Sequence, residues 1–305
     1  MNRPNTFIIG APKCGTSSLA KYLAGHPGVF FCTPKEPFYW CRDFWRAKHE
    51  LNLKSLDDYL ALFARADRAR HKVIAEGSTR YLRSDVAISG ILEFDPDARF
   101  IVMLRNPVEL VQAFHMEQCY SLQENVRSFE TAWRLQTERA EGRCLPKHCA
   151  SPEFLQYGRV AALGEQLDRA KRIIPEGQLK VILFDDFKQD TGAVYRDVLA
   201  FLGLPDDRRT EFPVVNSAHV HRFEWLAKLI LTPPGVFEKP VLRLRRHLWE
   251  NRYPPVEWVK ARLNRGKARE NLPAGLRAEL QACFRPDVEK LGRLLNRDLS
   301  HWVKD

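Results

Sequence analysis

Four short apolar runs along the chain have the pattern of buried β-strands. They are rich in Ile, Val and Phe, and each ends at a polar or glycine-containing turn. The runs are Thr6–Ile9, Lys72–Ala75, Arg99–Leu104 and Lys180–Phe184. Because strands buried on both faces read as continuous apolar runs, we expect these four to form the centre of one sheet.

Segments with helical spacing separate the apolar runs. Pro107–Tyr120 is the clearest, since Asn106 stands at the N-cap position and Pro107 at the first helical position. The other predicted helices are Ser17–Leu23, Val160–Ile174, Ala193–Leu202 with Gly203 as its C-cap, and Arg277–Leu295. Strands that alternate with helices predict an α/β fold, with a central, mostly parallel sheet flanked by helices.

Composition narrows the class of protein. The chain has 305 residues, of which 45% are hydrophobic and 28% charged, as in globular proteins, and we expect one domain over residues 1–305. The net charge of +10 favours an anionic partner. Seven cysteines without repeated spacing argue against a disulfide framework, and no signal peptide or membrane span is evident. We therefore expect a cytoplasmic protein, with peripheral contact to a membrane left open.

A basic segment that contains aromatic residues occupies about residues 243–269. Its charges are Arg243, Arg245, Arg246, Arg265, Lys267 and Arg269, mixed with Trp249, Tyr253 and Trp258. It is interpreted as a solvated surface, as a contact for a nucleotide phosphate, or as a site for an acidic glycan or an anionic lipid headgroup. Nucleic acid is not expected, because no recognition motif accompanies the charge.

The first predicted strand opens into a loop that suits a phosphate group. Its sequence is Gly10-Ala11-Pro12-Lys13-Cys14-Gly15-Thr16-Ser17-Ser18, and a helix follows. Glycines let the backbone approach an anion, and the amides and dipole of the helix start attract it. A Walker A loop ends in Gly-Lys-Ser/Thr, whereas here Thr16 follows Gly15 and the lysine comes earlier. A nucleoside triphosphate with magnesium is therefore the poorer fit.

Six segments in order resemble a known family. Pro12-Lys13-Cys14-Gly15-Thr16-Ser17 resembles the 5′-phosphosulfate loop of sulfotransferases that use 3′-phosphoadenosine 5′-phosphosulfate (PAPS). The later segments are similar to the family's Lys-Glu-Pro segment of carbohydrate-type and bacterial members, its Glu-x-Ser/Thr-Pro-x-Tyr segment, its 3′-phosphate motif and its closing regions. They are Lys35–Tyr39, Glu76–Tyr81, Leu104–Glu109, Phe201–Pro205 and Phe284–Trp302. The resemblance implies a sulfotransferase fold like that of P-loop nucleotide kinases.

The resemblance also implies roles for individual residues. Lys13 is expected to stabilise charge on the departing phosphate, and Glu36 to be the general base that deprotonates the acceptor. The expected donor-binding residues are Lys13, Cys14, Gly15, Thr16, Ser17 and Ser18 at the 5′-phosphate, and Arg105 with Arg265 or Lys267 at the 3′-phosphate. PAPS would be the donor, adenosine 3′,5′-bisphosphate (PAP) the product, and no metal is required. The acceptor would offer a hydroxyl or an amine on a carbohydrate or glycolipid, with a small-molecule natural product as second choice.

Some positions leave alternatives open. Ala113 stands where the family has a serine that also holds the 3′-phosphate, and Thr79 where it has proline. His26 and His115 are rival bases, and Glu76 either orients Lys13 or Lys35 or caps a turn. A P-loop kinase or NTPase, and a non-catalytic relative that binds nucleotide or glycan, remain as the other classes. Cys144, His148 and Cys149 lack a second pair at zinc spacing, so a metal site is not expected.

Overall fold

Five parallel strands form the central sheet of this computed structural model, which describes residues 2–44, 53–147, 149–213, 219–221, 240–241, 244, 253, 264–266 and 271–304. The strands are β1 (Thr6–Gly10), β2 (Val29–Phe31), β3 (Val73–Gly77), β4 (Arg99–Leu104) and β5 (Leu179–Leu183). Their order across the sheet is β2-β3-β1-β4-β5, and every neighbouring pair is parallel. The prediction of a central parallel sheet is confirmed.

The sheet brings three segments that are distant in sequence to one edge. β1 lies between β3 and β4, and Ile8 is in register with Gly77 on one side and with Ile101 on the other. Because the strands are parallel, the loop after β1, the end of β3 and the residue after β4 all follow carboxyl ends at the same edge. In open α/β sheets this edge is where ligands bind.

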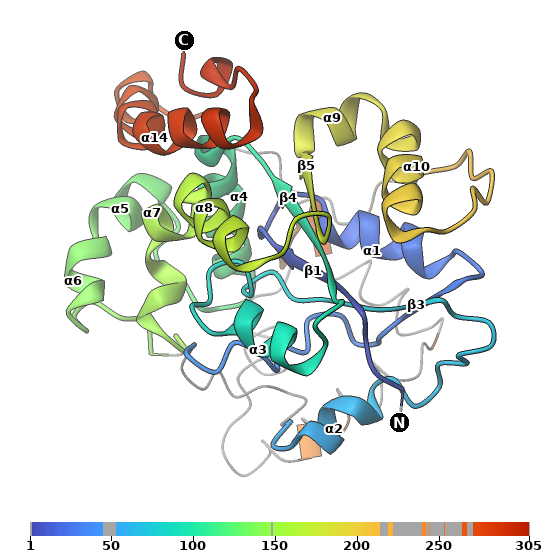
Figure 1. Cartoon of the computed structure of the whole chain (residues 1–305). Helices are drawn as coiled ribbons and strands as arrows, with labels where there is room; N and C mark the ends of the chain where they lie inside the picture. The colour runs from blue at the N-terminus through green and yellow to red at the C-terminus, as the bar shows by residue number, and fades with distance from the viewer. Residues whose placement is uncertain are drawn as a thin grey trace.

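Helices cover both faces of the sheet. Figure 1 shows α1 (Thr16–Ala24), α9 (Phe184–Gln189) and α10 (Thr191–Leu202) on one side, and α3 (Ala87–Phe94), α4 (Pro107–Tyr120), α8 (Leu163–Ile173) and α14 (Ala274–Leu295) on the other. The shorter elements are α2 (Leu56–Ala61), α5 (Phe129–Arg134), α6 (Gln136–Ala140), α7 (Tyr157–Val160) and the 3₁₀ turns Pro152–Leu155 and Ser300–Trp302. A separate antiparallel pair joins β6 (His219–His221) to β7 (Asn264–Gly266), and β6 lies against α4.

The predicted elements agree with the structure in most places. Asn106 caps α4, since its side chain accepts a hydrogen bond of 2.9 Å from the Val108 amide. Gly203 ends α10 in the left-handed region, with φ 66°. The predicted helix Val160–Ile174 is wrong as one element, because α7 and α8 are separated at residues 161–162, where the Leu163 amide bonds back to Ala161. β2 was not predicted.

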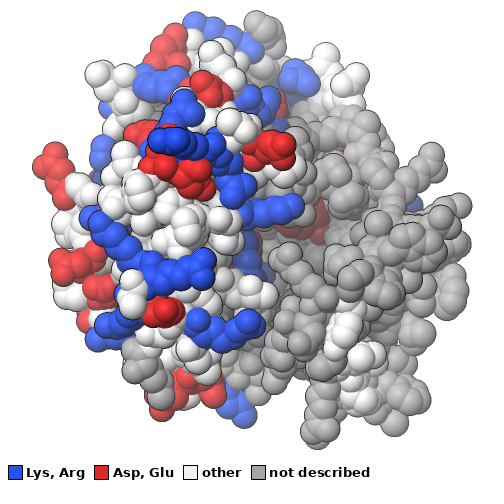
Figure 2. Space-filling view, turned by 90° about the vertical axis from the view of Figure 1, so that its right-hand side faces the viewer, with Lys and Arg blue, Asp and Glu red and all other residues white. Residues whose placement is uncertain are grey.

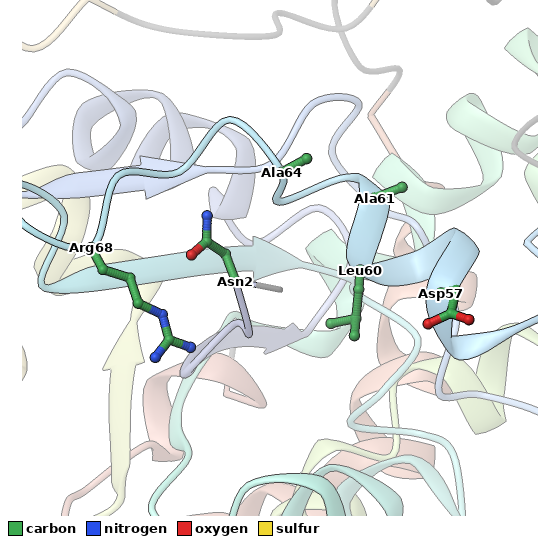
Figure 3. Close-up of a pocket in the computed structure, with 6 residues that line it drawn as sticks. All are labelled: Asn2, Asp57, Leu60, Ala61, Ala64 and Arg68. Carbon is green, nitrogen blue, oxygen red and sulfur yellow. The ribbon is translucent and has the colours of Figure 1, made fainter.

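The surface of the described part is charged and mixed. Figure 2 shows basic and acidic side chains beside one another over that face, so the surplus of positive charge is not segregated there. A hollow of about 590 Å³ is lined by Asn2, Asp57, Leu60, Ala61, Ala64 and Arg68 (Figure 3). Asn2 precedes the amino end of β1, whereas the phosphate loop follows its carboxyl end, so this hollow is not the expected site. Among the described helices, none has the length and apolarity needed to cross a bilayer.

Candidate active site

The loop after β1 ends in two backbone amides that have no partner in the described part of the chain. Helix α1 begins at Thr16 without a side-chain cap, and the amides of Ser18 and Leu19 both bond to the Gly15 carbonyl. The amides of Thr16 and Ser17 make no hydrogen bond to any residue that the structure describes. Unpaired amides at a helix start, together with the helix dipole, form an anion site.

Packing under the loop explains its glycine. Gly15 has φ 90°, and a Cβ added there would lie 3.0 Å from the Phe184 ring. Cys14 is fully buried, its thiol lies 3.3 Å from the Pro12 carbonyl, and burial raises the pKa of that thiol to about 12. Of the predicted donor-binding residues in this loop, Cys14 therefore has only its backbone to offer. The side chains of Thr16 and Ser18 are also buried, and that of Ser17 is half-buried.

Arg105 follows β4 and is hydrogen-bonded to the phosphate loop. Its guanidinium donates to the Lys13 carbonyl at 3.1 Å, forms an ion pair with Glu109 and lies 4.6 Å from the centre of the Phe184 ring. The residue is 6% exposed. Glu109 and the Lys13 carbonyl thus engage the guanidinium in this structure, and the role of Arg105 at a 3′-phosphate stays a prediction.

Lys13 meets a carboxylate that the sequence did not single out. Its Nζ lies 3.5 Å from Oε1 of Glu117, which is on α4. Glu117 comes four residues after Ala113 and therefore lies on the same face of the helix. The Glu117 side chain is 44% exposed, yet surrounding protein atoms and the Glu36 carboxylate raise its pKa, while Lys13 acts in the opposite direction.

Glu36 lies in the loop after β2, bound on both carboxylate oxygens. Lys35 Nζ donates to Oε1 at 2.8 Å, and the Thr79 hydroxyl donates to Oε2 at 3.1 Å. The Lys35 side chain passes over Gly77, where an added Cβ would lie 3.1 Å from Lys35 Cε. Glu36 itself has φ 68°, in the region that L-residues rarely adopt.

Electrostatics link these groups into one cluster, the Lys13 cluster, which consists of Lys13, Lys35, Glu36, Arg80 and Glu117. The charges of Lys13, Glu36 and Lys35 all act on Glu117, and those of Glu36 and Glu117 act on Arg80. Arg80 lies between two aromatic rings, 4.1 Å from Phe38 and 4.3 Å from Phe154, and burial lowers its pKa. The structure thus brings the predicted pair Lys13 and Glu36 into one charged cluster at the expected edge of the sheet.

Glu76 is buried beside this cluster without belonging to it. The residue is 0% exposed, and its carboxylate accepts hydrogen bonds from the hydroxyls of Tyr59, Ser78 and Tyr81 at 2.7, 2.8 and 3.0 Å. Burial raises its pKa to about 7, against the effect of these bonds and of Lys35. Its direct partners are hydroxyls, rather than the lysines or the turn considered from sequence.

The two rival bases have structural partners. His26 Nδ1 accepts from the Gly28 amide at 2.9 Å, so Nε2 carries the proton and donates to the Pro205 carbonyl at 3.0 Å. His115 is buried, with Nε2 2.8 Å from the Val126 carbonyl. Both nitrogens of His26 are thus engaged by backbone groups, and Nε2 of His115 is engaged by the Val126 carbonyl.

The other two predicted donor-binding residues, Arg265 and Lys267, fall on the basic segment. Arg265 lies in β7, opposite Val220, and the structure describes only its backbone. Lys267 and His148 lie outside the described residues. All seven cysteines are among the described residues and none forms a disulfide, and among the described side chains no group of three His, Cys, Asp or Glu is arranged to hold a metal.

Comparison with known proteins points in one direction. A model described as "Sulfotransferase family" matches residues 4–208. Human carbohydrate sulfotransferase 15 is 32% identical over 143 residues, which cover 35% of this chain and 26% of that protein. The bovine bifunctional heparan sulfate N-deacetylase/N-sulfotransferase 2 is 22% identical over 72% of this chain and 23% of its own length. The chain thus spans about a quarter of the length of these relatives.

A solved structure resembles the chain over its whole length. A sulfotransferase from Alicyclobacillus acidocaldarius is 26% identical, covers 100% of both chains and superposes with a TM-score of 0.73. Its likeness extends beyond the family match, which ends at residue 208. The fold therefore corresponds to that of a bacterial sulfotransferase, as the sequence predicted.

Proposed function

Since the chain belongs to the sulfotransferase family, we propose that it transfers a sulfuryl group from PAPS to a hydroxyl or amine of a carbohydrate-type acceptor. The observation that supports this most is that the phosphate loop, whose Thr16 and Ser17 amides have no partner among the described residues, lies at the same edge of the sheet as Lys35 and Glu36. An anion site and a carboxylate base within one charged cluster are what sulfuryl transfer requires.

The reaction is an in-line displacement at sulfur. The acceptor oxygen or nitrogen forms the new bond to sulfur, the bond from sulfur to the bridging phosphate oxygen breaks, and Glu36 takes the acceptor proton. PAP leaves with the bonding electron pair on its phosphate, where the Lys13 ammonium offsets the added charge. The amides of Thr16 and Ser17 hold the 5′-phosphate. The leaving group is a stable phosphate anion, so the reaction needs no metal.

The acceptor class rests on the relatives and on the cluster. Both of the relatives compared above have the word carbohydrate or heparan sulfate in their names. In this chain Lys35 and Arg80 lie on the Glu36 side of the Lys13 cluster, where they offer donors to the oxygen atoms of a sugar. A glycan or glycolipid acceptor is therefore the proposed class, ahead of a small-molecule natural product.

Ligand-induced stabilisation separates this proposal from an NTPase. We expect PAP to raise the melting temperature more than ATP does, with or without magnesium, because the loop lacks the Walker lysine. At a hundredfold excess over Kd, linkage adds about 2.7 kcal/mol to the free energy of unfolding. The measurement is a thermal-shift panel of PAP, ATP and ATP with magnesium. A larger shift with magnesium-ATP would contradict the sulfotransferase assignment.

Arg105→Ala should remove the preference for PAP over adenosine 5′-monophosphate. One bond to a charged phosphate contributes about 1.5–3 kcal/mol. The Kd of adenosine 5′-monophosphate divided by the Kd of PAP should therefore fall by about 10- to 150-fold. Because Arg105 also supports the Lys13 carbonyl, both affinities will drop, and only their ratio reports on the 3′-phosphate. Glu109→Ala releases the guanidinium and should raise the ratio instead. Equal affinity of the parent protein for both nucleotides would show that no 3′-phosphate is read.

A further inference from the structure

The loop that carries Glu36 has a strained backbone that needs support. Glu36 has φ 68° and Phe38 has φ 53°, so two of three consecutive residues adopt the left-handed region. Non-glycine residues persist there only where surrounding contacts fix them. The contacts that fix this loop therefore decide where the Glu36 carboxylate points.

Two hydroxyls connect the loop backbone to a buried charge. The Phe38 amide donates to the Ser78 hydroxyl at 3.1 Å, and the Trp40 amide donates to the Tyr81 hydroxyl at 3.3 Å. Each hydroxyl in turn donates a hydrogen bond to the Glu76 carboxylate, at 2.8 Å from Ser78 and 3.0 Å from Tyr81. A hydroxyl that both accepts and donates is fixed in orientation, and such chains strengthen each bond within them.

We propose that Glu76 is a positioning residue: through Ser78 and Tyr81 it fixes the backbone of residues 38–40 and thereby aims Glu36 and Lys35 at the acceptor. This deepens the proposed function and rests on it, since aiming matters only if Glu36 is the base. The arrangement also explains why this carboxylate is buried although no described lysine or arginine bonds to it. Three hydroxyl groups donate to the carboxylate, and two of them also accept a hydrogen bond from a loop amide, so the position of Glu76 fixes that of the loop.

Tyr59 supplies a matched control. Its hydroxyl donates at 2.7 Å to Oε1 of Glu76, the oxygen that also accepts from Tyr81. Unlike the Tyr81 hydroxyl, it accepts no hydrogen bond from a backbone amide of the described loop. Its ring stacks on Tyr39 with centroids 4.6 Å apart, and phenylalanine keeps that stacking. Tyr59→Phe therefore removes one hydrogen bond to Glu76 and leaves both links to the loop, whereas Ser78→Ala and Tyr81→Phe each remove one link.

Glu76→Gln tests the carboxylate that accepts the three hydrogen bonds. A glutamine side chain has one acceptor oxygen and a donor NH₂ group, so it cannot accept from three hydroxyls, and at least one must turn. At pH 8, above the Glu76 pKa of about 7, the parent carboxylate is mostly ionised and accepts all three. Turnover, the Kd of PAP and amide hydrogen–deuterium exchange at Phe38 and Trp40 are therefore measured at pH 8.

Glu76→Gln, Ser78→Ala and Tyr81→Phe should each lower kcat by about 10- to 100-fold, the effect of misplacing a catalytic group. PAP affinity should stay within about twofold, and exchange at Phe38 or Trp40 should rise by about tenfold as the loop opens locally. Tyr59→Phe should change neither kcat nor exchange at Phe38 and Trp40. The melting temperature of this variant should nevertheless fall, as it does in the other three variants.

Two results would overturn the inference. Unchanged exchange at Phe38 and Trp40 in all three variants would do so whether or not the protein is active. Equal losses of kcat in Tyr59→Phe would show that the carboxylate only supports the fold. An inactive parent that prefers magnesium-ATP to PAP would instead refute the proposed function, while the exchange data still decide whether Glu76 fixes the loop.

Discussion

Glu36→Gln is expected to lower turnover by about 10²- to 10⁴-fold, the usual contribution of a general base. Glutamine keeps the shape of the side chain but cannot take a proton from the acceptor. PAP affinity should remain nearly unchanged, because Glu36 bonds to Lys35 and Thr79 and not to the phosphate loop. The measurements are the initial rate of sulfate transfer and the Kd of PAP.

Glu130→Gln is the matched control for this substitution. It makes the same chemical change in an exposed ion pair, 3.8 Å from Arg134 on α5, and should leave turnover as it was. Activity of Glu36→Gln within a few-fold of the parent would clear Glu36 as the base. Glu117 would then be the next candidate for the base. Backbone groups bind the imidazoles of His26 and His115, and three hydroxyls bind the carboxylate of Glu76.

Lys13→Ala is expected to lower kcat by about 10²- to 10³-fold, the effect of removing one preorganised group that stabilises charge in a transition state. The Kd of PAP should change far less, because the charge that Lys13 offsets develops mainly as the bond to sulfur breaks. Single-turnover rates and PAP binding, measured on the same preparation, separate the two effects. Unchanged turnover with collapsed PAP affinity would make Lys13 a binding residue instead.

Glu117 complicates this test, and a second variant resolves it. In the parent, the Glu117 carboxylate is paired with Lys13 at 3.5 Å. Without Lys13 it would repel the anionic donor and weaken PAP binding by itself. Lys13→Ala combined with Glu117→Gln removes that repulsion, so PAP affinity should recover while kcat stays low. Lys21→Ala, an exposed lysine in the last turn of α1, serves as the control for loss of one positive charge.

Local sequence signals predicted the frame of the site. Glycine, lysine and hydroxyl residues after an apolar run located the phosphate loop, and a proline after a capping asparagine located α4. β2 escaped because Val29–Phe31 is only three residues long. The break between α7 and α8 escaped because no glycine or proline marks Ala161 and Ala162.

Contacts between segments that are distant in sequence could not be predicted. The pairing of Lys13 with Glu117 depends on where α4 crosses the loop, and helical spacing from Ala113 was the one available hint. The passage of Lys35 over Gly77 requires knowing that β2 lies beside β3. The roles of Arg265 and Lys267, the single domain over residues 1–305 and the cytoplasmic location stay predictions.

The buried thiol in the phosphate loop has a practical consequence for labelling. Thiol reagents attack the thiolate, and a pKa of about 12 keeps the Cys14 thiol protonated at pH 7. Cys144 and Cys283 are exposed on the described surface. Because burial and the Glu279 carboxylate raise the pKa of the Cys283 thiol, a maleimide dye should attach to Cys144 first and leave the loop intact.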